Sequence, residues 1–228
     1  MTKFHSAAPT EAVDDYLKAI LELSGQADDR VTSNALAAHL GIRAASVTGM
    51  LQKLAGLEIP FVQYEKHRGV RLSPAGRSRA LEVIRHHRLL ERFLHDVLDY
   101  SWDEVHEEAE RLEHYISERL EDRIAARLGN PGVDPHGHAI PAKNGVMAER
   151  KEVELPRWPC DVPGVVSSVS DRDPAALREM KRLGLLPGAR VLIEPGSRAG
   201  SLLVRIGGEA AVRLTPQIAA GVLIGELL

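Results

Sequence analysis

The sequence predicts a mainly α-helical protein with small β parts, and three observations predict it. Apolar residues recur at helical spacing through most of residues 11–128. Two short β-type segments with a glycine turn interrupt that pattern at residues 61–72. After residue 160, short apolar runs separated by proline and glycine turns are typical of a small β-barrel. We therefore divide the chain into residues 1–74, a winged helix-turn-helix; 75–141, a helical domain; 142–160, a linker; and 161–228, the barrel.

Composition limits the class of protein. The 228 residues are 44% apolar but only 4% aromatic, so the cores must be aliphatic. The single cysteine, Cys160, excludes an intrachain disulfide and a cysteine zinc cluster within one chain. No apolar run reaches about 18 residues, and residues 1–6 lack the apolar core of a signal peptide. We expect a cytoplasmic protein without membrane association.

The net charge of −3 hides a strong asymmetry along the chain. Residues 30–90 carry ten lysines and arginines against three acidic residues, whereas residues 91–130 carry five arginines against twelve acidic residues. Such a pattern suggests a part that binds a polyanion joined to a part that binds cations.

Residues 32–54 have the pattern of a helix-turn-helix. Thr32 can cap a short helix that Gly41 ends, and a second helix follows with its apolar residues on one face. Its other face is small and polar, which suits the major groove of DNA. The alternative is two short helices in a bundle.

A basic hairpin tip at residues 65–69 adds a wing to this unit, and Ser73-Pro74 then begins a long helix. A winged helix-turn-helix with a local excess of positive charge favours DNA binding. The candidate groove contacts are Ser46, Thr48 and Gln52, and the candidate phosphate contacts are Arg43, Lys53, Lys66 and Arg68.

Metal ligands are predicted on the helices that follow. His87 and Glu91 are spaced i,i+4 on the long helix, whereas His86 and His95 do not share that face and are expected on the polar surface. If residues 103–128 form one helix, a single arc of it carries His106, Glu110, Glu113 and His114, beside an apolar stripe. The alternative for this acidic run is a solvated face. His136 and His138, in the proline- and glycine-rich stretch 130–141, are interpreted as loop residues.

Taken in order, these segments resemble the diphtheria toxin repressor family, also called the iron-dependent repressors, over nearly the full chain. The matching segments are residues 15–17, 45–48, 64–69, 87–91, 105–114, 135–137, 140–141 and 185–188. The resemblance implies a helical metal-binding and dimerisation domain, and an SH3-like domain of the FeoA type at the C-terminus. It also implies a homodimer and a double-stranded DNA operator, with no small-molecule substrate.

The resemblance also implies two metal sites. The primary site is Asp15, Glu110, Glu113 and His114, and the second is His87, Glu91 and His106. Oxygen ligands at Asp15 and Glu110, where iron-responsive members have sulfur, favour Mn²⁺ over Fe²⁺.

The sequence departs from the family pattern at three places. Lys18 stands where manganese regulators have a further acidic ligand. Ser168 and Asp171 fall where iron-responsive members draw ligands from the third domain, and only Asp171 suits a metal. Gly49 replaces a glutamine that reads a base, so the operator cannot be transferred from the family.

We therefore expect a metal-dependent transcriptional regulator that is not an enzyme and that represses metal-uptake genes when metal is plentiful. Two alternatives stay open. One is a metal-independent winged-helix regulator whose third domain recruits a partner. The other is a carboxylate-bridged di-metal enzyme, although the Glu-x-x-His pairs usual in such enzymes are missing from the segments interpreted as metal-binding.

Overall fold

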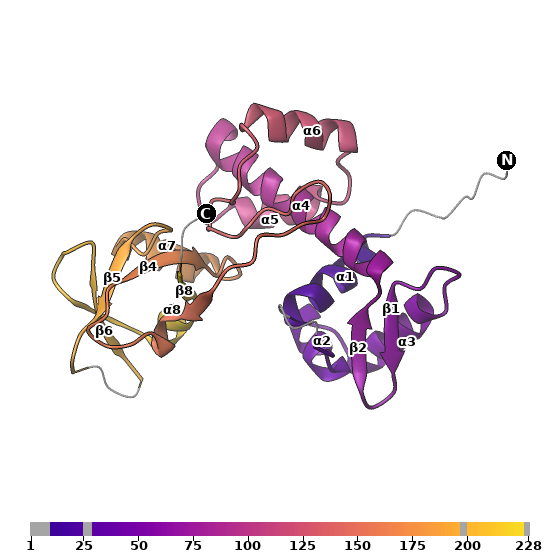
Figure 1. Cartoon of the computed structure of the whole chain (residues 1–228), viewed down its shortest axis with the longest axis horizontal. Coiled ribbons are helices and arrows are strands. Elements are labelled where there is room, and N and C mark those ends of the chain that lie inside the picture. The colour runs from indigo at the N-terminus through magenta and orange to yellow at the C-terminus, as the bar shows by residue number, and fades with distance from the viewer. Residues whose placement is uncertain (1–9, 25–28, 197–199, 226–228) are drawn as a thin grey trace. The chain divides into compact units, whose positions relative to one another are not determined.

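The computed structural model describes residues 10–24, 29–196 and 200–225 and divides into two compact units (Figure 1). The N-terminal unit comprises residues 1–85 with 143–145, and the C-terminal unit comprises residues 86–142 with 146–228. Residues 1–6, considered above for a signal peptide, lie outside the described residues. Within the part of the chain that the structure describes, no helix has the length and apolar character needed to cross a lipid bilayer.

The N-terminal unit contains the expected helix-turn-helix. It is built from α1 (Glu11–Ser24), α2 (Ser33–Leu40) and α3 (Ala44–Ala55). The Thr32 side chain accepts a hydrogen bond from Ala35 N at the start of α2, and Gly41 ends that helix in the left-handed region with φ +65°. The aliphatic core that joins the three helices includes Leu17, Ile20, Leu36, Val47 and Leu51.

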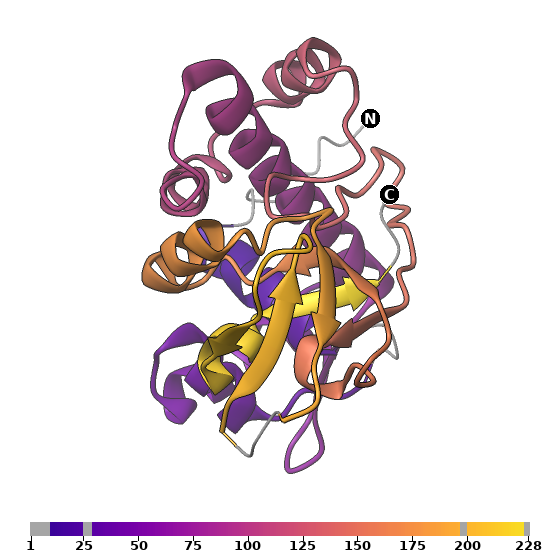
Figure 2. The same cartoon turned by 90° about the vertical axis from the view of Figure 1, so that its left-hand side faces the viewer.

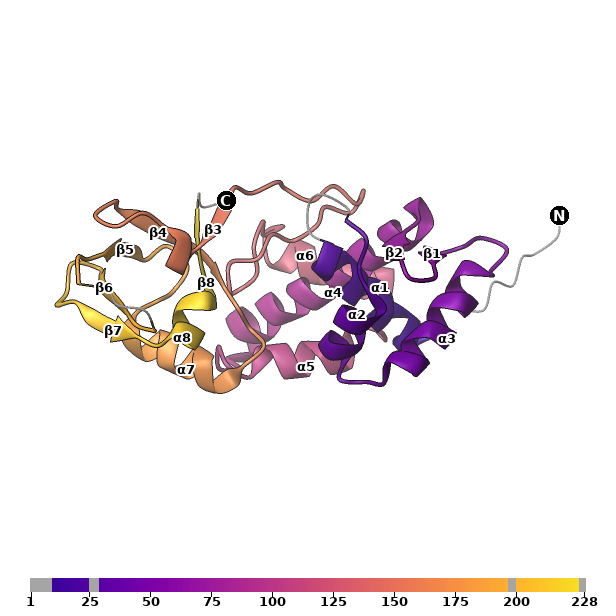
Figure 3. The same cartoon turned by 90° about the horizontal axis from the view of Figure 1, so that it is seen from below.

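The wing is the antiparallel hairpin of β1 (Val62–Glu65) and β2 (Gly69–Leu72), which lies beside α3 in the same unit (Figure 3). Arg30 supports it by donating to the Gly69 carbonyl and by pairing with Glu65. Gly69 has φ +97°, and a Cβ there would lie 2.5 Å from the Val31 carbonyl oxygen. The turn therefore requires glycine.

Helix α4 (Pro74–Leu98) begins where Ser73 Oγ accepts a hydrogen bond from Gly76 N, as the sequence predicted. It continues into the C-terminal unit, where it packs against α5 (Val105–Leu112) and α6 (Glu118–Arg127). Their shared core is aliphatic and consists of Leu89, Leu90, Leu94, Val105, Ala109, Ile124, Ala125 and Ile140.

The expected single acidic helix over residues 103–128 is wrong, because α5 and α6 are separate helices. Helix α5 ends at Leu112, and the chain turns before Ser117 adopts an extended conformation with φ −84° and ψ 152°. The Ser117 side chain accepts a hydrogen bond from Leu120 N and caps α6. An internal N-cap therefore interrupts a run with strong helical spacing.

The C-terminal domain is a six-stranded antiparallel sheet in the order β3-β8-β4-β5-β6-β7 (Figure 2). The strands are β3 (Glu152–Glu154), β4 (Gly164–Val169), β5 (Arg190–Ile193), β6 (Leu202–Ile206), β7 (Val212–Leu214) and β8 (Val222–Gly225). The helices are α7 (Pro174–Leu183), α8 (Pro216–Ala220) and the 3-10 turn η1 (Leu155–Arg157). Strand β3 and η1 fall within residues 142–160, which were expected to be a linker. Trp102 belongs to this domain's core, so the helical part and the sheet pack together.

Candidate metal centre and nucleic-acid interface

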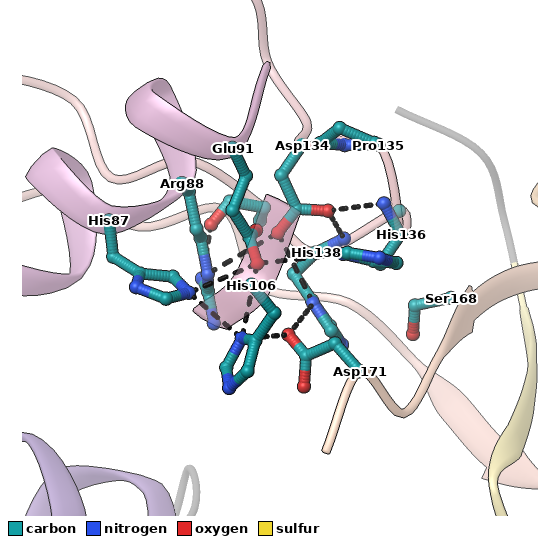
Figure 4. Close-up of polar contacts among 12 residues, drawn as sticks. His87, Arg88, Glu91, His106, Asp134, Pro135, His136, His138, Ser168 and Asp171 are labelled. Atoms are coloured by element: carbon teal, nitrogen blue, oxygen red, sulfur yellow. Dashed lines mark hydrogen bonds and ion pairs between the residues drawn. The ribbon is translucent and has the colours of Figure 1, made fainter. Parts of the chain in front are cut away.

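His87 is buried, and its ring points toward a cluster of imidazoles and carboxylates that includes Glu91 and His106 (Figure 4). Its Nδ1 contacts the Glu113 carboxylate at close range. Its Nε2 lies 3.0 Å from Glu91 Oε1 and 3.2 Å from His106 Nδ1. The His87 ring on α4 therefore contacts Glu113, just after α5, on one side and a second group of possible metal ligands on the other.

The second group consists of His87, Glu91, His106 and Asp171, whose donor atoms all lie within 4.8 Å of one another. His106 Nδ1 is 3.2 Å from Glu91 Oε1 and 3.5 Å from Asp171 Oδ2. Asp171 follows β4 and precedes α7, so the C-terminal domain contributes a carboxylate to this group. Ser168 is instead hydrogen-bonded to Glu152 at 3.2 Å.

A loop that sequence reasoning interpreted as a plain connection adds two further donors. Asp134, His136 and Glu91 form another group with donor atoms within 4.8 Å. Asp134 Oδ1 accepts the backbone N–H of His136 at 2.8 Å and of His138 at 3.0 Å, which makes a tight Asx turn. The Asp-Pro-His-Gly run was the available signal for the turn, because Asp before Pro and Gly is typical of a tight turn.

Glycine and backbone hydrogen bonds fix this loop against β4. Gly137 has φ +93°, and a Cβ there would lie 2.2 Å from the Ser167 carbonyl oxygen. Val169 N donates to the His136 carbonyl at 3.0 Å, and Trp102 Nε1 donates to the Pro135 carbonyl at 3.0 Å. The loop is therefore held by both the sheet and the helical part.

The orientation of His136 supports a cation in this cluster. Its Nε2 donates to the Trp102 carbonyl at 2.9 Å, so Nδ1 faces Glu91 Oε1, 3.6 Å away, and offers a lone pair once it loses its proton. Among the described residues, neither His136 Nδ1 nor Glu91 Oε2 makes a hydrogen bond, although both atoms are buried. Buried nitrogen and oxygen atoms arranged in this way fit the ligands of a divalent cation.

Protons balance the charge of this cluster in the metal-free protein. Burial raises the pKa of Glu91, but the charge of His87 and the nearby rings of His106 and His136 outweigh it and leave the pKa well below its usual value. Burial lowers the pKa of His136, but the close approach and the charge of Glu91 raise it to about 9. The pKa of Asp171 is lowered, because attraction to His138 and His106 exceeds the opposing effect of burial. A bound cation can replace these protons.

The acidic group lies on and just after α5. Glu113 is buried, and its Oε1 is 3.7 Å from His114 Nε2. Glu110 Oε1 is 3.8 Å from His87 Nδ1, and His87, Glu110 and Glu113 form a further group of possible ligands. Asp15 is half-buried on α1 of the N-terminal unit. Lys18, on the same helix, is 9% exposed.

The expectation that His86 lies on the polar surface is wrong, because this residue is only 4% exposed. The side chain of His95 is 40% exposed, as expected. Both residues are on α4, where the i,i+9 spacing turns them to opposite faces.

The candidate DNA contacts lie on the surface of the N-terminal unit. Arg43, at the N-cap of α3, and Ser46, Gln52 and Lys53 along that helix are exposed. Thr48 is half-buried, and its hydroxyl donates to the Ala44 carbonyl at 3.1 Å. Lys66 and Arg68 are exposed at the tip of the wing, where Arg68 also pairs with Glu65 at 3.1 Å.

Comparisons with known proteins identify this architecture. Residues 9–70 match the N-terminal DNA-binding domain of iron-dependent repressors, residues 73–142 match their metal-binding and dimerisation domain, and residues 154–225 match the FeoA domain. The iron-dependent repressor IdeR of Mycobacterium leprae is 36% identical over 174 residues, which cover 71% of this chain and 75% of the relative. The chain belongs to the iron-dependent repressor family. It is accordingly a metal-dependent transcriptional repressor and not an enzyme.

The family has both iron-dependent and manganese-dependent members. The regulator MntR of Geobacillus kaustophilus is 36% identical over 119 residues, which cover 51% of this chain and 79% of the relative. The solved structure of a manganese-dependent transcriptional repressor in complex with manganese is similar to this chain, with 37% sequence identity and a TM-score of 0.86. The alignment covers 94% of this chain and 100% of the solved chain. A divalent metal is therefore the cofactor of this family member.

Proposed function

We propose that Mn²⁺ is the metal to which this iron-dependent repressor family member responds, with Fe²⁺ as the second candidate. The observation that carries the proposal is the donor set, because the groups that contain Glu91, Glu110, Glu113 and Asp171 hold only carboxylates and imidazoles within the described residues. Oxygen and nitrogen ligands suit Mn²⁺, whereas thiolate selects softer ions. The single cysteine, Cys160, is exposed and its Sγ lies 3.4 Å from the Ile193 carbonyl oxygen.

Two metal sites are part of this proposal. The primary site is Asp15, Glu110, Glu113 and His114, and it rests on the family resemblance. The second site is His87, Glu91, His106 and Asp171, and it is supported by their close placement in the C-terminal unit. Asp134 and His136 face Glu91 from the loop and are further candidates for ligands there. A bound cation would supply the positive charge that these buried carboxylates otherwise take from protonated imidazoles.

Metal would control DNA binding because residues from two parts of the chain share one set of ligands. Asp15 belongs to α1, in the same unit as the recognition helix, whereas Glu110, Glu113 and His114 belong to α5 and the turn that follows it in the dimerisation domain. Sharing one ion between these residues restricts the movement of the DNA-binding unit, so that metal selects one arrangement from a mobile ensemble. By reciprocity, DNA tightens the binding of metal.

The proposed partners are a second copy of the chain and a double-stranded operator in the cytoplasm. Large apolar side chains are exposed on the helical part, with Tyr115 71%, Leu98 52% and Leu120 47% exposed. Such side chains fit a dimer seam. Two recognition helices about 34 Å apart would then read two half-sites. In this proposal Ser46, Thr48 and Gln52 contact base edges, whereas Arg43, Lys53, Lys66 and Arg68 contact phosphates.

Selection of operator DNA from a genomic library, followed by anaerobic titration of the metal-stripped protein with Mn²⁺ or Fe²⁺ at fixed salt, tests the choice of metal. We expect DNA binding at a lower free concentration of Mn²⁺ than of Fe²⁺. Activation at a lower free concentration of Fe²⁺ would overturn the assignment of manganese and leave the metal-dependent repressor in place.

A further inference from the structure

His86 presents a ring nitrogen to carboxylates outside both metal sites discussed above. The ring is 4% exposed, and its Nδ1 lies 3.2 Å from the backbone carbonyl oxygen of Glu113. A carbonyl oxygen only accepts, so Nδ1 must carry the hydrogen. In the neutral ring Nε2 then holds a lone pair, which is free to bind a cation.

Two carboxylates from the first turn of α6 face this nitrogen. Glu121 Oε2 lies 3.4 Å and Glu118 Oε1 lies 3.6 Å from His86 Nε2. Their i,i+3 spacing places both side chains on the same side of the helix. The side chain of Glu121 is 2% exposed and that of Glu118 is 58% exposed, so this trio reaches from the interior to solvent.

The distances are those of ligands around an ion. An N–H···O hydrogen bond is typically about 2.7–3.2 Å long, and His86 Nε2, although buried, makes none with the residues that the structure describes. Two atoms bound at about 2.0–2.2 Å to one tetrahedral zinc ion lie about 3.3–3.6 Å apart. The separations of the two carboxylate oxygens from His86 Nε2, 3.4 Å and 3.6 Å, both fall within that range.

The other face of the ring has the partner that a metal-bound histidine needs. Histidines that bind metals almost always donate their second ring N–H to a backbone carbonyl, a carboxylate or water, which fixes the ring. His86 does so to the carbonyl of Glu113. The burial of the ring, its tautomer and its orientation therefore all point Nε2 at a shared cation.

We propose that His86, Glu118 and Glu121 form a third divalent-cation site, between α4 and α6, that takes Zn²⁺. One imidazole nitrogen and two carboxylate oxygens suit this ion, and such sites bind zinc more tightly than manganese or iron. The exposed Glu118 leaves room for water at the fourth position. The site is one hydrogen bond away from the backbone of Glu113.

The test is the amount of Zn²⁺ bound per chain by full-length, metal-stripped protein in equilibrium dialysis, with metal measured by mass spectrometry. His86→Gln removes the ligand, and His86→Arg removes it while keeping a positive charge against the two glutamates, so at least one variant should fold. Glu118→Gln alters only the exposed ligand. His95→Gln, on the same helix, is the matched control.

We expect the wild type and the control His95→Gln to bind the same number of zinc ions, and His86→Arg to bind one fewer. The number of Mn²⁺ ions bound by His86→Arg should be unchanged. Glu118→Gln should bind that same zinc at least about tenfold more weakly, since a ligand is lost. Wild-type zinc binding by folded His86→Arg and Glu118→Gln would overturn the proposal. Loss of a manganese ion together with the zinc would also overturn it, because His86 would then act through Glu113.

Discussion

His106 Nδ1, on α5, lies 3.5 Å from Asp171 Oδ2, which belongs to the C-terminal domain. This pair brings a carboxylate from the sheet domain to a cluster that is otherwise built on the helical part and its loop. Trp102 reinforces the same junction by packing into the core of the sheet domain. The third domain therefore supplies a candidate ligand to the proposed second metal site.

Asp171→Asn should weaken metal binding at the second site. The substitution replaces a charged ligand by a neutral amide, and we expect at least about a tenfold loss of affinity there. Calorimetric titration with Mn²⁺ measures this loss. Glu179→Gln is the control, because the Glu179 side chain, in the same domain, is 41% exposed and pairs with Arg182. Equal affinities in the Asp171 variant and the control would remove Asp171 from the ligand set.

The adjacent residues Asp14 and Asp15 should respond differently to substitution. Asp14 is buried and receives two hydrogen bonds from Arg79, at 2.8 Å and 2.7 Å, which also raise the pKa of Arg79. Asp14→Ala should therefore lower the free energy of unfolding by about 3 kcal/mol, because it breaks a buried ion pair. Asp15→Ala should leave urea unfolding of the metal-free protein within about 1 kcal/mol of wild type, and abolish the metal response. The reverse pattern would contradict the proposed roles.

Metal affinity should rise with pH. The pKa of His136 is about 9 in the metal-free protein because of Glu91, so the ring is protonated at pH 7. A cation on Glu91 neutralises the charge that raises this pKa, and the ring then releases its proton. The released proton makes the apparent affinity increase about tenfold per pH unit up to about pH 9. His136→Gln should lose that contribution to the slope, measured by Mn²⁺ titration from pH 6.5 to 8.5. An unchanged slope would be inconsistent with this linkage.

Lys66→Ala should weaken binding to all DNA sequences alike. A phosphate contact carries no sequence information, so its loss should flatten the plot of log affinity against log salt by about 0.9. Fluorescence anisotropy on operator and random duplexes measures both effects. Lys181→Ala, exposed on α7 of the C-terminal unit, is the control. If binding to the operator alone decreased, Lys66 would be reading bases.

Local signals in the sequence were sufficient for much of the fold. Thr32 capped the start of α2 and Gly41 ended it as predicted, and the wing turned at Gly69. These elements depend on capping, glycine conformations and periodicity, which are properties of short segments. The helix break before Ser117 was missed because the helical spacing of the apolar residues continues through it.

The site was less predictable because burial depends on tertiary packing. Spacing and resemblance predicted His87, Glu91 and His106 as ligands, and the resemblance predicted Asp171; the structure places these four side chains together. His136 was not predicted beside them, because its position depends on β4 and on the Trp102 carbonyl, both distant in the sequence. His86 was missed because α6 covers it only after the chain has turned at residues 113–117.

The central claim is that metal held by the acidic residues of α5 switches on DNA binding. We would compare wild type, Glu110→Ala and the matched control Glu107→Ala, whose side chain is 78% exposed on the same helix and pairs with Arg111. Each metal-stripped protein is titrated with Mn²⁺ without oxygen in the presence of operator DNA. We predict metal-dependent binding by the wild type and Glu107→Ala and none by Glu110→Ala. Equal binding by all three proteins, or binding without metal, would contradict the switch.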